Sequence, residues 1–231
     1  MRWRAGMFLV CFFLLAVGVV SAQLPVQFGI KAGVPLTDNF ELGPQNVYFN
    51  YSSQTNRYTI GPMIEIRNLP LHLSFEFDAL YKRLHYDHSY DEISGGAGES
   101  YYFSSQYVSN RWEFPLLLKY KPPLPRHIFY VSVGPTVNYV TDSESTLTTT
   151  AVSNYSGDKY TFKSKASALE LKRISTGGVV AGGGCNFHIG PLHLSPELRY
   201  TRWLNRNFAA GLLAPLQSNQ NQLDVLLGLT F

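Results

Sequence analysis

Cysteine and charge are both scarce in this sequence. Two of the 231 residues are cysteines, and only 15% of the residues are charged. Cys11 lies in an N-terminal stretch that we expect to be removed, so Cys185 is left alone in the mature chain and an intramolecular disulfide is excluded. The formal net charge of +3 loses Arg2 and Arg4 with that stretch. The nearly neutral remainder excludes the basic surface of a nucleic-acid-binding protein.

Long apolar runs are missing beyond residue 22. The first 22 residues have the order of a secretory signal peptide, in which Arg2 and Arg4 precede an apolar core over residues 8–20 and the small residues Ser21 and Ala22 end a cleavage site. We therefore expect a signal peptide at 1–22 and one mature domain at 23–231. No later run reaches the roughly 18 apolar residues that a spanning helix needs, so any membrane residence must come through strands.

The composition favours many short strands and turns, because the chain contains 19 Gly, 15 Tyr and 15 Phe residues. Eight stretches alternate between apolar and polar or small residues with a period of two, which predicts a strand in each. The predicted strands are residues 27–34, 58–67, 73–82, 112–120, 129–139, 179–189, 192–200 and 222–231.

The connections between these strands alternate strictly in length. Residues 68–71, 121–126 and 190–191 are short turns, whereas the intervening segments, about residues 35–56, 83–110, 140–176 and 203–221, are long and polar. This order is typical of an eight-stranded antiparallel transmembrane β-barrel with short periplasmic turns and long extracellular loops. We expect such a barrel in the bacterial outer membrane, surrounded by outer-membrane lipid, with protease-accessible loops near residues 94–105 and 143–165.

Charge separates the two faces of the strands. One face of each strand has no charged residue across its middle, while the other carries the predicted lumen charges, which are Lys31, Glu65, Arg67, Glu76, Asp78, Lys82, Glu113, Lys119, Glu197, Arg199 and Asp224. A lipid-exposed Lys or Arg costs about 2–4 kcal/mol at the bilayer midplane, so a membrane would impose this separation. A soluble lipocalin-type barrel has the same period with the faces reversed. Aromatic residues near the strand ends favour the membrane type: Tyr58, Tyr81, Trp112, Tyr120, Tyr139 and Tyr200.

The last strand has one purely apolar face, formed by Leu223, Val225, Leu227, Leu229 and Phe231. This stretch resembles the carboxy-terminal signal that the barrel assembly machinery is thought to read in bacterial outer-membrane proteins. We therefore predict that Phe231, Leu229, Leu227 and Val225 form an assembly signal. A buried last strand of a soluble sandwich is the alternative.

Three segments resemble the PorT-like family of small outer-membrane β-barrels, whose architecture OmpX and the OmpA membrane domain share. They are WEFPLLLKY (112–120), FYVSVGPTVNYV (129–140) and GGGCNFHIGPLHLSPELRYTRWL (182–204). The resemblance implies no catalytic residues, and the family's namesake takes part in a secretion system.

Other candidate sites are incomplete. The glycine run over residues 176–184 lacks the Gly-Lys-Ser/Thr ending of a phosphate loop, and small residues there let neighbouring side chains approach. His188 and His193 flank a turn symmetrically, but two imidazoles alone do not complete a metal site. The loop His85–Ser94 has donors without a defined ligand spacing. We expect no metal and no cofactor.

The sequence favours a non-catalytic barrel that presents its loops for binding, structural, or assembly and secretion roles. The loops offer tyrosines for contact, namely Tyr48, Tyr51, Tyr86, Tyr90, Tyr101 and Tyr102. A narrow small-solute channel is the alternative, and an outer-membrane lipid-modifying enzyme with Ser, His and a carboxylate is less favoured. The paired charges of an eight-stranded lumen would close the passage. No surface or secretion partner is named by the sequence.

Overall fold

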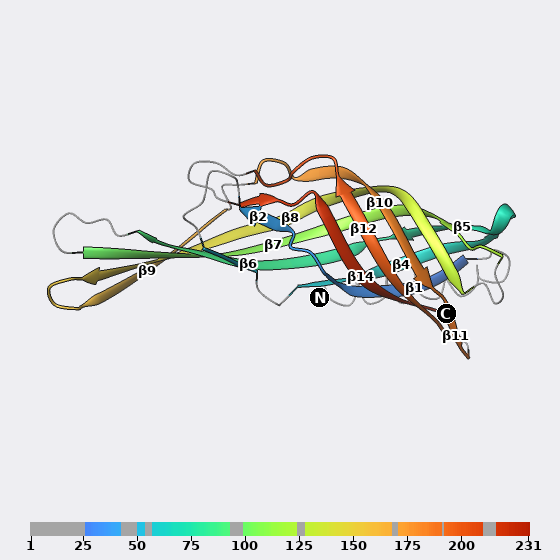
Figure 1. The fold of residues 1–231 in the computed structure, drawn as a ribbon, viewed down its shortest axis with the longest axis horizontal. Coiled ribbons are helices and arrows are strands. Elements are labelled where there is room, and N and C mark those ends of the chain that lie inside the picture. The colour runs from blue at the N-terminus through green and yellow to red at the C-terminus, as the bar shows by residue number, and fades with distance from the viewer. Residues whose placement is uncertain are drawn as a thin grey trace, which may run out of the picture.

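The chain forms a closed antiparallel ring of eight strand positions (Figure 1). This computed structural model describes residues 26–42, 50–53, 57–92, 99–123, 128–167, 171–190, 192–209 and 216–231. The signal peptide predicted at 1–22 lies outside these residues. The ring closes where β14 pairs with β1, with Leu229 opposite Ile30. Its strands are β1 (Val26–Pro35), β4 (Tyr58–Leu69), β5 (Leu73–Asp78) with β6 (Leu80–Glu92), β7 (Glu99–Tyr120), β8 (Phe129–Ser153), β10 (Ser175–Cys185), β12 (Leu192–Trp203) and β14 (Asn221–Thr230).

The short connections meet at one end of the barrel, which is the predicted periplasmic end. A 3-10 turn, η1 (Pro70–His72), joins β4 to β5, and β11 (Phe187–Ile189) forms a hairpin with β12. At the other end β2 (Phe40–Leu42) pairs with β13 (Leu216–Ser218) in a separate small sheet. Among the described residues no helix is long and apolar enough to cross a bilayer.

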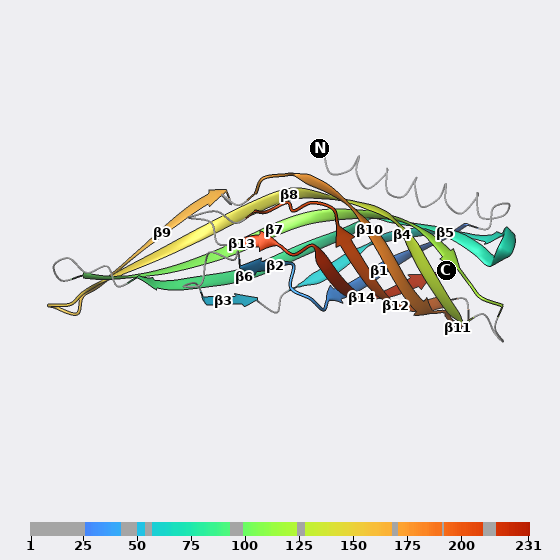
Figure 2. The same cartoon turned by 45° about the horizontal axis from the view of Figure 1, so that its top comes forward.

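Strands β6, β7 and β8 are much longer than predicted and extend beyond the barrel (Figure 2). Together with β3 (Asn50–Ser53) and β9 (Lys159–Ser167) they form a projecting sheet, here called the extracellular sheet, over residues 50–53, 84–92, 99–109, 141–153 and 159–167. The prediction that 83–110 and 140–176 are loops was therefore largely wrong. Threonine and tyrosine favour strands despite their polarity, and polarity alone had suggested loops.

Two predicted strands are interrupted. The strand predicted at 73–82 breaks at Ala79, whose backbone N donates to Pro62 O (3.0 Å). The strand predicted at 179–189 breaks at Asn186, whose backbone N donates to Ile128 O (2.6 Å). Each break releases one strand residue from the regular ladder and bends the strand locally.

The barrel is apolar outside and polar inside. On β8, Val131, Val133 and Val137 face outward, with Val133 52% exposed, whereas Ser132, Thr136 and Asn138 are buried. Around the described ring the outward face is likewise apolar, while the charged side chains of the strands point inward together with some apolar ones such as Met63, Leu117 and Leu226. An apolar outer face suits a wall whose surroundings are hydrocarbon. The lipocalin-type alternative is therefore wrong, because it requires the apolar face inside.

Aromatic side chains mark the outer edge of this apolar wall. The ring centroids of Tyr58 and Tyr81 are 6.3 Å apart, and those of Tyr81 and Trp112 are 5.5 Å apart. We call Tyr58, Tyr81, Trp112, Tyr139 and Tyr200 the outer aromatic belt.

Candidate functional site

The middle of the lumen holds a compact network of ion pairs. Lys31 Nζ on β1 donates to Glu76 Oε1 (2.5 Å), Glu197 Oε2 (2.9 Å) and Asp78 Oδ2 (3.3 Å). Arg199 on β12 donates from Nε to Glu197 Oε1 (2.8 Å) and from Nη2 to Asp78 Oδ2 (2.9 Å). All five side chains are buried. The cations and carboxylates of β1, β5 and β12 therefore fill the space that the ring encloses.

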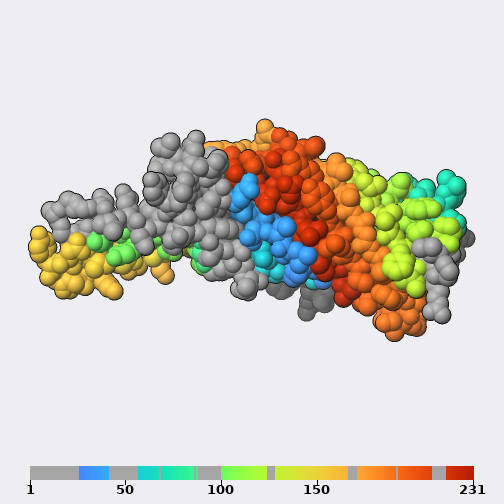
Figure 3. All heavy atoms as spheres, in the orientation of Figure 1, coloured from blue at the N-terminus to red at the C-terminus, as the bar shows by residue number. Residues whose placement is uncertain are grey.

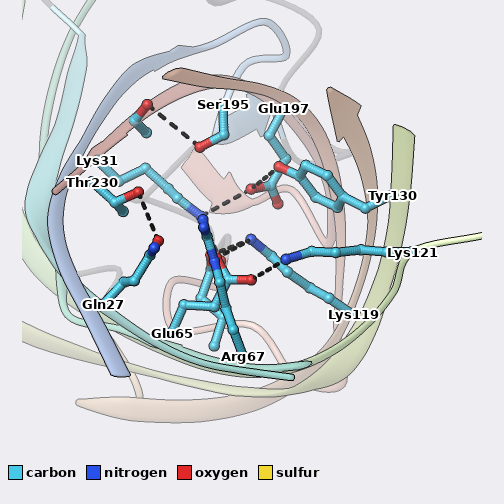
Figure 4. A network of polar contacts seen from close by, with 12 residues as sticks. Gln27, Lys31, Glu65, Arg67, Lys119, Lys121, Tyr130, Ser195, Glu197 and Thr230 are labelled. Atoms are coloured by element: carbon cyan, nitrogen blue, oxygen red, sulfur yellow. Dashed lines mark hydrogen bonds and ion pairs between the residues drawn. The ribbon is translucent and has the colours of Figure 1, made fainter. Parts of the chain in front are cut away.

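A second group of charges closes the periplasmic side (Figure 4). Glu65 Oε1 accepts from Lys121 Nζ (2.6 Å), and Glu65 Oε2 lies 3.3 Å from Arg67 Nη2. Burial lowers the pKa of Lys121, which lies just beyond the end of β7, although the Glu65 carboxylate opposes this shift. Lys119 pairs with Glu76 and so joins this group to the middle network.

Tyr130 contacts the network with both its hydroxyl group and its aromatic ring. Its hydroxyl donates to Glu197 Oε2 (3.2 Å), and Lys119 Nζ lies 4.4 Å from its ring centroid. The glycines of β10 make this arrangement possible: a Cβ on Gly184 would lie 2.6 Å from the Tyr130 hydroxyl, and one on Gly182 would lie 3.1 Å from Glu197 Oε1. The run over 176–184 therefore serves packing in a strand, as the sequence indicated.

The outer half of the lumen repeats the pattern with other residues. Lys82 Nζ donates to Asp224 Oδ2 (2.7 Å) and pairs with Glu113 Oε2 (2.9 Å). Arg111 Nη2 pairs with Glu113 Oε1 (3.1 Å) and donates to Asn39 Oδ1 (2.6 Å). Asn39 directly precedes β2. Its hydrogen bond with Arg111 therefore connects the barrel wall to the segment that crosses the outer opening of the barrel, here called the mouth.

An apolar cluster plugs that mouth. Its buried members are Phe40, Leu84, Tyr107, Val140 and Phe208, with Leu171 packed against them. The rings of Phe40 and Phe208 meet edge to face at 5.1 Å between centroids. Phe208 is held by its backbone N, which donates to Ser218 Oγ on β13 (3.0 Å). The lumen is thus filled by three charged layers and covered by an apolar plug.

The structure brings the predicted lumen charges together inside the ring. All of them are buried except Arg67, which is half-buried at the periplasmic end. Sequence reasoning missed Arg111, Lys121, Phe40 and Phe208. Arg111 lies two residues before Glu113 and so on the same face, and a strand prediction begun one residue earlier, at 111 instead of 112, would have included it.

The two histidines of the β11–β12 hairpin face each other. His188 lies opposite His193 in the β11–β12 hairpin, with ring centroids 4.3 Å apart. No group of three or more His, Cys, Asp or Glu in the part of the chain that the structure describes is arranged to hold a metal ion. Most side chains of the candidate segment His85–Ser94 lie outside the described set.

The residues of the predicted assembly signal line the outer wall. Val225, Leu227 and Leu229 on β14 point outward, and Phe231 is 64% exposed just beyond the end of that strand. Their exposure leaves them free to contact lipid.

The extracellular sheet carries exposed aromatic and basic residues at its edge. On β9, Tyr160 and Phe162 alternate with Lys159, Lys163 and Lys165, and Phe162 is 65% exposed. At the β8–β9 turn Tyr155 is 89% exposed. Of the predicted loop tyrosines, Tyr102 is exposed and Tyr101 half-buried, whereas Tyr48 and the side chains of Tyr51, Tyr86 and Tyr90 lie outside the described set.

Comparison with known proteins identifies a family. The model described as "Outer membrane protein beta-barrel domain" matches residues 21–209. No curated protein matches the sequence.

Solved structures of outer-membrane proteins are similar to parts of this chain. Ail, the attachment invasion locus protein of Yersinia pestis, has 10% identity and a TM-score of 0.27 over 89% of this chain and 97% of that chain. Its complex with the heparin analogue sucrose octasulfate gives 10% identity and a TM-score of 0.31 over the same shares. The outer membrane protease OmpT of Escherichia coli has 10% identity and a TM-score of 0.20 over 90% of this chain and 91% of that chain.

Proposed function

The chain belongs to the family of outer membrane protein β-barrel domains and lies in the bacterial outer membrane, and from this premise we propose that it is a non-catalytic barrel whose extracellular sheet binds a protein partner outside the cell. Such a role needs a rigid contact surface that the membrane does not cover.

The length of the extracellular sheet is the observation that carries this proposal. The β6–β7 and β7–β8 ladders continue as far as Glu92 opposite Tyr101 and Ser153 opposite Glu99. Backbone hydrogen bonds hold the sheet in shape, so little conformational entropy is lost when a partner docks. Exposed aromatics such as Phe162 and Tyr155 supply large contact area at such surfaces.

The contents of the lumen count against the channel alternative. A conducting barrel needs a continuous water-filled path, whereas here ion pairs from Lys31, Arg199 and Lys82 bridge opposite walls. The apolar plug around Phe40 and Phe208 adds a layer of buried apolar side chains above them.

We further propose the finer assignments that the sequence predicts. They are a PorT-like role in secretion or assembly, a signal peptide at 1–22 and recognition of the last strand by the barrel assembly machinery. The family match supports the general barrel type, and these narrower statements rest on the sequence segments quoted above.

Site-specific crosslinking in the native cell tests the proposal. A photo-crosslinking residue at Phe162, on the exposed edge of the sheet, should give a discrete protein adduct. The same probe at Val133, on the lipid-facing wall, is the matched control. Absence of any adduct from Phe162 and Tyr155, or identical adducts from Val133, would contradict a sheet-borne partner.

A further inference from the structure

One edge of the extracellular sheet is formed by β9, which pairs with β8 on one side. Within the described ranges no strand pairs with its other side. The side chains of residues 159–165 are all exposed, and Figure 3 shows this end of the sheet, in yellow, projecting from the rest of the molecule. The strand therefore has an open edge, to which a further strand can add.

The register of the ladder fixes which backbone groups face this open edge. Ser153 N donates to Asp158 O (3.0 Å), so these two residues form a hydrogen-bonded pair where β8 turns into β9. Bonded and non-bonded pairs alternate along an antiparallel ladder, and the β8–β9 ladder continues from this point without a register shift. The backbone groups that point away from β8 therefore belong to every second residue of β9, namely Lys159, Thr161, Lys163 and Lys165.

Three of these four residues are lysines, whose side chains lie on one face of the sheet. The β8 residues opposite the lysines are uncharged, namely Val152, Thr148 and Thr146. A nearby carboxylate compensates them only weakly, because Lys165 Nζ lies 3.9 Å from Glu144 Oε2 and both side chains are largely exposed. The open edge thus carries a row of positive charge.

The other face of β9 is aromatic. Tyr160 is 58% exposed on this face, and Phe162 is exposed to a similar extent. The β8 residues opposite them are the smaller Ala151 and Thr149. A strand that adds to β9 would therefore contact lysines on one face and aromatic rings on the other.

A second copy of this chain fits the edge poorly. Two β9 strands paired antiparallel about a two-fold axis would bring their lysines together on the same face, and like charges in facing positions destabilise a sheet. Lysines on edge strands generally oppose such self-association. A strand with carboxylates at alternate positions would instead be attracted by the same lysines.

We propose that the protein partner contributes an extended, acidic strand that adds to the open edge of β9 through backbone hydrogen bonds. Its carboxylates lie beside Lys159, Lys163 and Lys165, and its apolar side chains, at the alternate positions, pack on Tyr160 and Phe162. This inference rests on the proposed function, since it specifies where on the sheet the partner binds and which chemistry the partner presents there.

Peptide binding to the refolded mature chain tests this mode. The probe is a short synthetic peptide in which glutamate and valine alternate, and fluorescence anisotropy measures its binding. We expect saturable binding that weakens roughly tenfold or more in the triple variant Lys159→Gln, Lys163→Gln and Lys165→Gln. A peptide with glutamine in place of glutamate should bind as weakly, and so should a glutamate peptide with methylated backbone nitrogens, which cannot donate to the edge.

Substitutions of Thr161 separate backbone pairing from charge. Thr161→Pro removes an outward-pointing N–H, and proline is tolerated at such edge positions, so we expect weaker peptide binding with unchanged thermal unfolding. Thr161→Val keeps the N–H and should bind like the wild type. Arg202→Gln, which removes an exposed charge from β12, should also leave binding unchanged. Equal binding of the acidic, glutamine and methylated peptides, or undiminished binding by the triple variant, would overturn the proposal.

The crosslinking assay in cells distinguishes this inference from the proposed function. We expect the adduct from Phe162 to be lost in the triple lysine variant. If adducts from Phe162 and Tyr155 persist in both the triple variant and Thr161→Pro, a partner binds the sheet through another surface. That result would refute strand addition at β9 and leave the proposed function standing.

Discussion

Lys31 illustrates how a single buried charge is accommodated inside the barrel. Three carboxylates surround its ammonium group, and Arg199 and Lys119, which pair with the same carboxylates, bring the cluster to three cations and three anions. Burying an ion costs several kcal/mol unless partners compensate it. Removal of one partner leaves an uncompensated buried charge, which lowers the stability of the folded protein. The network should therefore be most sensitive to loss of a member that several others share.

Replacement of Lys31 by methionine tests this sensitivity. Methionine keeps most of the length of the side chain but leaves Glu76, Asp78 and Glu197 short of a cation, so we expect the free energy of unfolding to fall by about 3–5 kcal/mol. Urea unfolding of the protein in lipid vesicles measures the change. Lys163→Met on exposed β9 is the control and should unfold like the wild type. Equal stability of the two variants would mean that the network contributes little.

At the level of single residues, the sequence predicted which face each charge occupies because the strand period is two. Lys82, Glu113 and Asp224 were assigned to the lumen by parity alone, and they meet there. Their partners were not predictable, because pairing depends on the register between strands that are distant in sequence. The apolar plug was missed for a related reason: Phe40 and Phe208 lie in segments without periodicity, and only the closed ring brings them together.

Strand elements depend on local backbone geometry as well as on alternation. Lys31 lies opposite Gly61 in the β1–β4 ladder, and the break at Ala79 adjoins the same place. A Cβ on Gly61 would lie only 1.9 Å from Ala79 O. The close approach of β4 to this break therefore requires glycine.

Gly61→Ala should disrupt the barrel, whereas Gly177→Ala should not. The new methyl group at residue 61 has no space, since its obstacle is backbone, while the nearest atom to a Cβ at residue 177 is 3.9 Å away. We expect a large loss of refolding yield for the first variant and wild-type yield for the second, measured by the heat-dependent gel shift of folded barrels. A normal yield for Gly61→Ala would show that β4 can move away from Ala79.

In the last strand, an effect on assembly can be distinguished from an effect on stability. Phe231 is mostly exposed at the end of β14, so its ring contributes little burial to the folded barrel. If it forms part of an assembly signal, deletion of Phe231 should lower the amount of protein inserted in the outer membrane of cells and leave refolding in detergent nearly unchanged. Membrane fractionation and the refolding assay give the two readouts. A parallel loss in both would assign Phe231 a purely structural role.

At the scale of the whole molecule, the barrel and the extracellular sheet have different roles. The ring is fixed in the bilayer by its apolar wall and filled inside by ion pairs, so it acts as a solid support. The extracellular sheet is formed largely by β6, β7 and β8, which continue from the ring. Among the described residues the pairing of these strands is regular, except for the register shift between Asn110 and Arg111. A partner bound to the sheet would therefore be held at a fixed orientation to the membrane.

This division predicts that the protein does not conduct ions. A permeating ion would have to pass the apolar plug and then three layers in which Lys82, Lys31 and Lys121 already pair with carboxylates. Planar-bilayer recordings of the refolded mature protein should show no reproducible unitary conductance. The double variant Phe40→Ala with Phe208→Ala, which opens only the mouth, should remain silent because the charged layers persist. Steady unitary currents from the wild type would favour the channel, and currents that appear only in the double variant would identify the apolar plug as the sole barrier.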